Sequence, residues 1–406
     1  MLRTYKYRIY PNKEQQVLLS KHFGCTRWLY NYALSRKNEE FLTNKKHLSR
    51  FDLQAELPAL KKDEKTAWLS EVNSQSLQST LKFLDAAFIK FFREKKGFPK
   101  FKSKKTHSFS FAVPQGVIAD FKEHKVSFPK FKKGIKTVFD REFVGDIRQA
   151  TIRQNPSGKY FISILVDTKE DVKIKPEPNI DSAIGIDLGI KDFLIMSDGT
   201  KIANPSYLKK SLKKLKREQR WLSRKQKGSS NRNKQRVVVA RQHEYISNQR
   251  EDFLQKLSTK LVCENQATTF CMEDLSVKNM VKNHNLARAI SDASWSKFVG
   301  MMKYKCEWYG QNIVLIGRFD PSSKMCSHCG HIHKNLKLSD RTWTCEKCGT
   351  IHDRDTNAAK NIRSFAFHMK NKIGQELPES TSVEKIIPLG NKSRSSMKQK
   401  SLEASG

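Results

Sequence analysis

Acidic residues are scarce in this chain of 406 residues. Only 41 Asp and Glu stand against 77 Lys and Arg, which gives a formal net charge of +36. A compact protein with such an excess repels itself unless a polyanion neutralises the charge, so nucleic acid is the expected partner. The alternative is a merely soluble basic protein, and the size of the excess argues against it.

Long apolar runs are also absent from the sequence. No segment approaches the roughly 18 consecutive apolar residues of a membrane span, so we expect no membrane partner. No signal peptide is recognisable, and four of the eight cysteines have metal-ligand spacing, which favours a reducing, cytoplasmic location, at the nucleoid when DNA is bound. We interpret the remaining cysteines as small buried side chains; they are Cys25, Cys263, Cys271 and Cys306.

Two Cys-x-x-Cys pairs stand close together near the C-terminal end. They are Cys326 with Cys329 and Cys345 with Cys348, and fifteen residues separate the pairs. Four thiolates at this spacing can close a tetrahedral zinc site, and they leave no open position for water. A redox dithiol is the alternative, but two pairs at ribbon spacing argue against it. We therefore predict one structural zinc ion in a ribbon over residues 321–349.

The N-terminal part of the chain changes pattern twice. Residues 3–10 form a β-rich run, and from about residue 13 to 95 apolar residues recur every three or four positions, which predicts a helical bundle. Short alternating runs broken by Pro and Gly follow, and they are typical of a small β-barrel. We expect residues 1–12 and 96–180 to form this barrel, with the bundle at 13–95 inserted into it.

The C-terminal part predicts a third domain, over residues 181–320 and 350–374, interrupted by the ribbon. Buried strands carry Asp187 and end on Glu273, and a helix begins near Asp355. The tail over 375–406 has little to bury and is expected to be disordered. The predicted fold class is therefore multidomain α+β.

A strongly basic segment lies inside this third domain. Residues 209–250 contain fifteen Lys or Arg and only two acids, Glu218 and Glu244, with a break at Gly228. The pattern predicts a helical hairpin, and because few acids are available for i,i+4 pairing, phosphate contact is favoured over a solvated face. The candidate nucleic-acid-binding residues on its first helix are Lys209, Lys210, Lys213, Lys214, Lys216, Arg217, Arg220 and Arg224.

Several motifs resemble the TnpB family. The segments 185–191, 272–275 and 355–362 are similar to the three RuvC motifs of that family, and the cysteine ribbon lies where the family places it. The resemblance extends over nearly the whole chain, through segments at 7–11, 68–72, 97–101 and 395–399. Spacing alone does not select three acids from this sequence; the resemblance selects Asp187, Glu273 and Asp355.

The resemblance implies a fold and an activity. It implies an RNase H-like RuvC nuclease domain with an inserted zinc ribbon, a β-barrel wedge domain and a helical recognition bundle. The implied activity is RNA-guided cleavage of double-stranded DNA, with guide RNA drawn from the transposon end and a short flanking motif read by the protein. The candidates for that reading are Ser74, Gln75 and Gln78 of the bundle and the segment 109–113.

The same resemblance implies the roles of the acids. Asp187 would bridge two metal ions, Glu273 would ligate one of them, and Asp355 would complete the site. Asp353 is the rival for the last role. Carboxylate ligands favour Mg²⁺ or Mn²⁺, and a pair of such ions can drive phosphodiester hydrolysis.

Two other functions remain open at this point. A non-catalytic RNA- or DNA-binding regulator of transposition or transcription would use the same basic hairpin without cutting. A transposase that exchanges strands itself would also use clustered acids. The sequence does not predict the oligomeric state.

Overall fold

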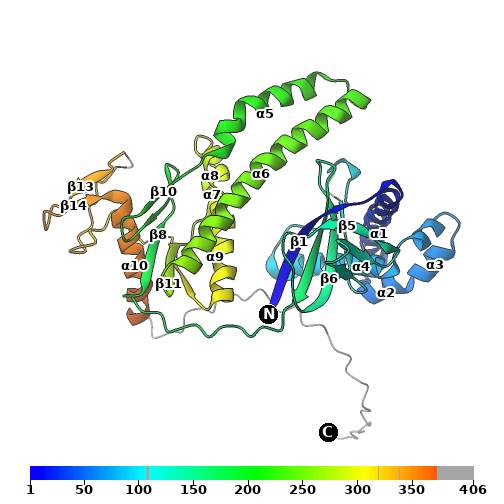
Figure 1. Cartoon of the computed structure of the whole chain (residues 1–406), viewed down its shortest axis with the longest axis horizontal. Coiled ribbons are helices and arrows are strands. Elements are labelled where there is room, and N and C mark those ends of the chain that lie inside the picture. Colours follow the sequence, from blue (N-terminus) through cyan, green and yellow to red (C-terminus); the bar gives the residue numbers. More distant parts are fainter. Residues whose placement is uncertain (107–108, 319, 338, 373–406) are drawn as a thin grey trace, which may run out of the picture.

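The computed structural model describes residues 1–106, 109–318, 320–337 and 339–372. They form two sheet-containing units joined by an extended connection at residues 168–182 (Figure 1). The expected tail at 375–406, with the motif at 395–399, lies outside the described residues. In the described part of the chain, no helix has the length and apolar character needed to cross a membrane.

The first unit contains a seven-stranded antiparallel sheet in the order β2-β6-β7-β1-β5-β4-β3. The first strand of the chain lies between β7 and β5, so residues far apart in sequence share one sheet. Pairing closes no ring between β2 and β3 among the described residues, and a closed barrel stays a prediction. The strands are β1 (Leu2–Tyr10), β2 (Phe109–Val113), β3 (Ile118–Asp120), β4 (Lys125–Phe128), β5 (Phe131–Val138), β6 (Asp146–Gln154) and β7 (Tyr160–Asp167).

Helices fill the interval between β1 and β2. Asn12 and Gln15 form a capping box that starts the first helix, and a left-handed residue, Lys45, ends it. Buried Leu29, Leu77 and others form the core that holds these helices together. The elements are α1 (Lys13–Asn44), α2 (Arg50–Ala55), α3 (Leu57–Lys62), the 3₁₀ turn η1 (Ala67–Glu71), α4 (Ser74–Glu94) and the 3₁₀ turn η2 (Lys104–Thr106).

The second unit contains a five-stranded sheet in the order β10-β9-β8-β11-β12. The strands β8, β11 and β12 run parallel, so their carboxyl ends meet at one edge, whereas β9 is antiparallel to β8. The strands are β8 (Ala183–Asp187), β9 (Asp192–Met196), β10 (Lys201–Ala203), β11 (Thr269–Glu273) and β12 (Asn312–Ile316).

Helices cover both faces of this sheet. On one face Phe270 and Met272 pack against α6 and α9, and on the other Cys271 packs against α10. The approach of α10 is close, because a Cβ at Gly185 would overlap the carbonyl oxygen of Ala359. The helices are α5 (Tyr207–Arg224), α6 (Ser230–Glu264), α7 (Val277–Met280), α8 (Ala287–Ala293), α9 (Trp295–Tyr309) and α10 (Arg354–Lys372).

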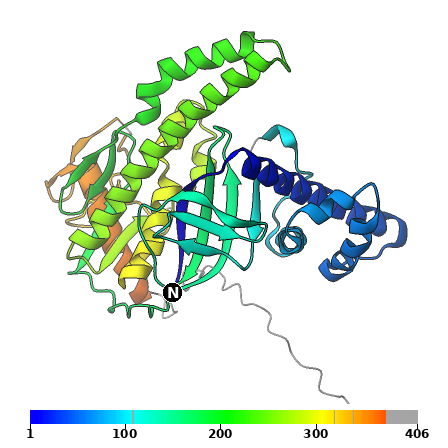
Figure 2. The ribbon, with the colours of Figure 1, turned by 45° about the vertical axis from the view of Figure 1, so that its right-hand side comes forward.

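The predicted basic hairpin is present as α5 and α6, which pack side by side and project from the second unit (Figures 1 and 2). Its second helix continues past residue 250 to Glu264, where it covers the sheet. The cysteine segment lies between β12 and α10 and contains a two-stranded sheet of β13 (Thr342–Thr344) and β14 (Ile351–Asp353).

Candidate active site

The fold places two of the three selected acids on neighbouring parallel strands. Asp187 is the last residue of β8 and Glu273 the last residue of β11, and the pairing of Met272 with Ile186 brings both to the same sheet edge. Asp355 lies in the first turn of α10, which packs on β8. Two strands and one helix, distant in sequence, therefore bring the acids together.

The three acids act on one another electrostatically. The pKa of Asp187 is raised to about 7, chiefly by burial and then by the negative charges of Glu273 and Asp355. Burial also raises the pKa of Glu273, to which the charge of Asp320 contributes. The edge of the sheet is thus a concentration of negative charge from which water is partly excluded, and a cation would relieve the repulsion.

Two of the acids have side-chain partners from this chain. Ser322 Oγ donates to Glu273 Oε1 over 2.6 Å, and Arg341 Nη1 lies 3.6 Å from Asp355 Oδ2. Among the described residues, only the four cysteines bring three or more ligand atoms of His, Cys, Asp or Glu within 4.8 Å of one another. The hard oxygen donors and their mutual repulsion fit Mg²⁺ or Mn²⁺, which would have to draw the carboxylates closer.

Asp353, the rival to Asp355, is engaged elsewhere. Its Oδ1 accepts a hydrogen bond from the backbone N–H of Thr356, and its Oδ2 lies 2.7 Å from Lys201 Nζ. The first contact caps the start of α10, and the second joins this helix to β10. Asp353 is therefore a structural acid at the entrance to α10, and Asp355 is the one whose charge acts on Asp187.

A cavity of about 220 Å³ opens beside Glu273, between β11 and α9. Apolar side chains such as Leu275 and Trp295 form much of its wall, and Lys303 lies at it as well. Nothing in the sequence pointed to this cavity, because its lining comes from a strand end and a helix that are not adjacent in the chain.

The four cysteines form a compact cluster. The Sγ atoms of Cys326 and Cys348 are 3.7 Å apart, and those of Cys329 and Cys345 are 3.6 Å apart. Four thiolates at 2.3 Å from one zinc ion would be separated by about 3.8 Å, so the spacing fits a shared zinc ion. His352 Nε2 lies 3.0 Å from Cys326 Sγ and would donate its hydrogen to that thiolate in the zinc-bound state.

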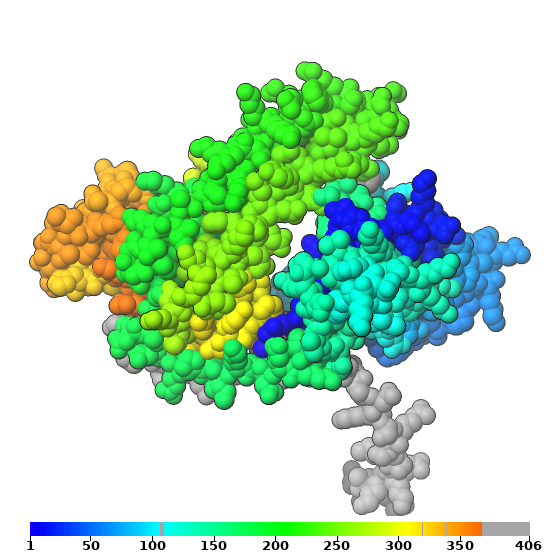
Figure 3. Space-filling view, viewed as in Figure 1, coloured from blue at the N-terminus to red at the C-terminus, as the bar shows by residue number. Residues whose placement is uncertain are grey.

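The exposed face of the hairpin is basic. Glu218 is buried between α5 and α6, where it accepts from Gln235, and Glu244 is bound by Lys159, Asn155 and Ser157 of the first unit. Neither acid is available to neutralise the outer face. All eight candidates on α5 are exposed, namely Lys209, Lys210, Lys213, Lys214, Lys216, Arg217, Arg220 and Arg224. Figure 3 shows the hollow between this hairpin and the first unit.

The candidates for motif reading lie in the other unit. Ser74 and Gln78 are exposed at the start of α4, Gln75 is half-buried beside them, and Ser74 Oγ accepts from Lys61 Nζ over 2.6 Å. The segment 109–113 is β2, an edge strand of the seven-stranded sheet. These residues belong to the first unit, whereas the three acids belong to the second.

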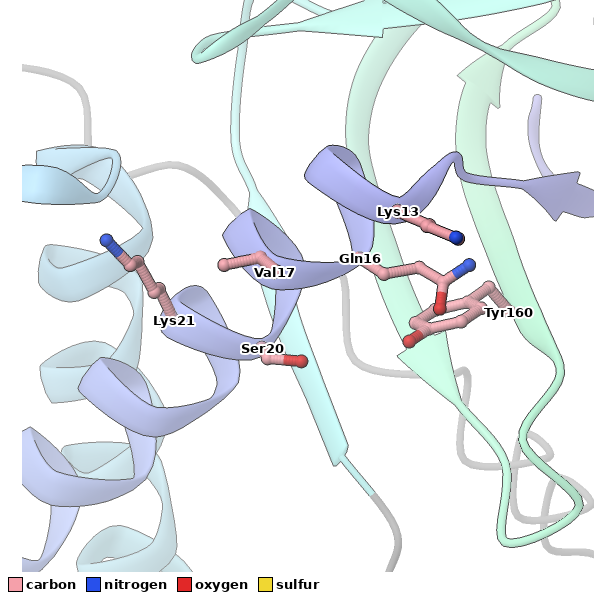
Figure 4. Close-up of a pocket in the computed structure, with 6 residues that line it drawn as sticks. All are labelled: Lys13, Gln16, Val17, Ser20, Lys21 and Tyr160. Carbon is pink, nitrogen blue, oxygen red and sulfur yellow. The ribbon is translucent and has the colours of Figure 1, made fainter.

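A shallow groove of about 520 Å³ lies on the first unit, and no sequence pattern indicates it (Figure 4). It runs along the N-terminal half of α1 to the start of β7. Lysines and uncharged polar groups line most of it, and the residues are Lys13, Gln16, Val17, Ser20, Lys21 and Tyr160.

Three family models match the chain. The OrfB_IS605 model, described as a probable transposase, matches residues 163–284, and the Cas12f1-like TNB domain matches residues 295–362. The third, described as a helix-turn-helix domain of OrfB_IS605, matches residues 1–46. In this structure that last segment is the strand β1 and the single long helix α1 rather than two helices joined by a turn.

Related proteins match most of the chain. A protein of Streptomyces pristinaespiralis with the provisional name RNA-guided DNA endonuclease is 41% identical, covering 89% of this chain and 88% of its own. InsQ of Escherichia coli K12, with the same provisional function in its name, is 32% identical, covering 89% of this chain and 91% of its own.

A solved structure has a similar fold. The protein of a Cas12f1–sgRNA–target DNA complex is 15% identical, with a TM-score of 0.54 over 89% of this chain and 98% of that chain. This agreement in fold is consistent with the mixed α+β architecture and with the relationships seen in sequence. Together with the motifs at 185–191, 272–275 and 355–362, these relationships show that the chain belongs to the TnpB family.

Proposed function

We propose that this protein is a transposon-encoded, RNA-guided endonuclease that cuts double-stranded DNA beside a short flanking motif. The observation that carries the proposal is that Asp187, Glu273 and Asp355 meet at one sheet edge. Burial of the carboxylates and their mutual repulsion favour the binding of cations there. Relatives with that provisional function cover most of this chain.

The acids would hold divalent metal ions, either Mg²⁺ or Mn²⁺. Two such ions, when bound, activate a water molecule and stabilise the leaving oxygen of a phosphodiester. Asp187, on which both other acids act, would contribute to both ions, while Glu273 and Asp355 would each bind one ion. Ser322 would keep the Glu273 carboxylate oriented towards this edge.

The other parts of the chain would bind the RNA, bind the DNA and add rigidity. The exposed basic face of α5 would bind guide RNA through phosphates, because no acid is left there to neutralise it. Ser74, Gln75, Gln78 and the strand β2 would read the flanking motif. The cysteine cluster would hold a structural zinc ion, since four thiolates leave no position for substrate.

The test combines guide identification with cleavage. The chain would be co-expressed with its flanking element DNA, and the co-purified RNA sequenced. The complex would then be given a matching duplex with Mg²⁺. Asp187→Ala is expected to lower the cleavage rate on the order of 10³-fold or more, about 4 kcal/mol of transition-state stabilisation, with RNA binding kept.

Asp198→Ala provides a matched control, since Asp198 lies in the exposed turn after β9 and its carboxylate only accepts from the backbone of Thr200. Its activity should equal that of the wild type. RNA bound without cleavage over a range of flanking motifs would favour the regulator, and joined DNA products would favour a strand-exchanging transposase.

A further inference from the structure

One loop contacts both the acids and the cysteines. The loop lies between β12 and the first cysteine and covers residues 320–326. Ser327, which follows it, makes one further contact. Ser322 in this loop is only 7% exposed, and its hydroxyl donates to Glu273 Oε1 over 2.6 Å. Four residues later, Cys326 belongs to the cysteine cluster. The loop therefore connects the two clusters along the chain.

Two carboxamides of α10 hold this loop in place. Asn361 Nδ2 donates to the carbonyl oxygens of Ser322 and Met325, over 2.7 and 2.6 Å. Asn357, one turn earlier, donates to Met325 over 2.7 Å and accepts from Ser327 N–H over 2.9 Å. Both amides are at most 2% exposed, so water does not compete for these contacts.

The helix that presents Asp355 thus also fixes the loop that orients Glu273. Asn357 and Asn361 lie on the same face of α10 because they are four residues apart, and Asp355 lies two residues before Asn357. A displacement of the loop would move the Ser322 hydroxyl away from Glu273, and the carboxylate would lose its orientation.

We propose that Ser322 is a positioning residue for Glu273, and that its loop couples the cysteine cluster to metal binding at the acids. The inference rests on the proposed nuclease function and deepens it. One carboxylate oxygen of Glu273 is engaged by the hydroxyl, which leaves the other free to bind a metal ion. Hydrogen-bond partners of this kind orient ligating carboxylates, and their removal costs 10–100-fold in metal affinity, as an order of magnitude.

The test measures metal binding without any cleavage. Mn²⁺ would be titrated into the full chain without RNA and followed by electron paramagnetic resonance, with Asp187→Ala as the background. Ser322→Ala is expected to weaken Mn²⁺ binding about 10–100-fold, with zinc content and thermal stability unchanged. Ser323→Ala is the matched control, because Ser323 lies beside it in the loop and its hydroxyl forms no hydrogen bond with the described residues; it should bind Mn²⁺ like the wild type.

Wild-type affinity in Ser322→Ala would overturn the proposal. If that variant loses zinc or stability, a double-mutant cycle with Glu273→Gln decides the matter. A residue that acts through Glu273 gives losses of Mn²⁺ affinity that do not add, whereas additive losses refute the positioning role. Cleavage is measured separately, so a wild-type chain that binds Mn²⁺ in this way but never cuts DNA would reject the nuclease function and leave the role of Ser322 intact.

Discussion

The cysteine cluster and the acid cluster are built in opposite ways. The four cysteines come from two short turns between Cys326 and Cys348, and their sulfur atoms already lie within 4.8 Å of one another. The acids come from β8, β11 and α10, and no three of their oxygens reach that distance. A closed site can be assembled by local sequence, whereas the acid site depends on the second sheet and the helix packed on it.

The two clusters also differ in how they contribute to stability. Thiolates that share a zinc ion stabilise the segment around them, because metal binding and folding are coupled. Partial burial, together with repulsion from the other two carboxylates, raises the pKa of Asp187, and the ionised acids destabilise the fold until a cation binds. Substitutions should therefore have opposite effects on stability at the two clusters.

The largest effect is expected from Cys345→Ser. Loss of one thiolate should remove the zinc ion and unfold β13 and β14 locally, because the small core there consists largely of Trp343, Leu336 and the cysteines themselves. Asp355 follows directly on β14, so its position should be lost as well. We expect zinc content near zero and cleavage lowered at least about 100-fold, the cost of misplacing a reacting group by about 1 Å.

Zinc analysis, hydrogen exchange over residues 342–353 and the cleavage assay would measure these effects. Cys263→Ser is the matched control, since Cys263, which we expected to be buried, is an exposed cysteine outside the cluster, and it should keep zinc and activity. Full cleavage by a zinc-free Cys345→Ser protein would remove the link between the two clusters.

The second-largest effect is a gain in stability from Asp187→Asn. In Mg²⁺-free buffer, the pKa of Asp187 is about 7 in the folded chain, well above its usual value of 3.8. The protonated carboxyl favours folding, so stability is full below pH 3.8 and is lost as the pH rises through about 7. Asp187→Asn should remove this loss, which is about 2 kcal/mol at pH 8 for a half-buried group.

Thermal melts between pH 5.5 and 8.5 would test this contrast. The wild type should lose stability over that interval, and Asp187→Asn should melt about 5 °C higher at pH 8 in the transition of the second unit. Added Mg²⁺ should raise the wild-type melting temperature but not that of the variant. If the melting temperatures of the wild type and Asp187→Asn changed with pH in the same way, the ionised acid cluster would not destabilise the fold. Asp198→Asn is the control and should behave like the wild type.

The difference between the clusters also explains what the sequence could predict. Both cysteine pairs and the basic face of α5 are local patterns, so spacing and charge identified them. The meeting of Asp187 with Glu273 depends on the parallel pairing of β8 with β11, which no local pattern contains, and resemblance alone selected these acids.

Other features of the site were missed because their partners are remote in sequence. Asp353 pairs with Lys201 of β10, and Ser322, in the loop after β12, donates to Glu273 at the end of β11. His352 lies against Cys326, a contact that no sequence pattern indicates. In each case the sequence gives the donor or acceptor, but only the tertiary fold gives its partner.

The smallest effect concerns an ion pair that joins the ribbon to the acids. Arg341 directly precedes β13, and its guanidinium lies 3.6 Å from Asp355 Oδ2. Its side chain is 62% exposed, so the pair is screened by solvent and contributes little to stability. Its positive charge nonetheless lies where a metal ion would approach Asp355.

Arg341→Gln should therefore strengthen Mn²⁺ binding to the free chain about two- to fivefold, because a competing cation is removed and exposed pairs amount to about 0.2–1 kcal/mol. The same Mn²⁺ titration measures it. Arg148→Gln is the matched control: Arg148 pairs with Asp167 in the first sheet and is similarly exposed, so its loss should leave Mn²⁺ binding unchanged. Weaker binding in Arg341→Gln would mean that the ribbon helps to hold Asp355 for the metal, and that the two clusters cooperate at this contact rather than compete.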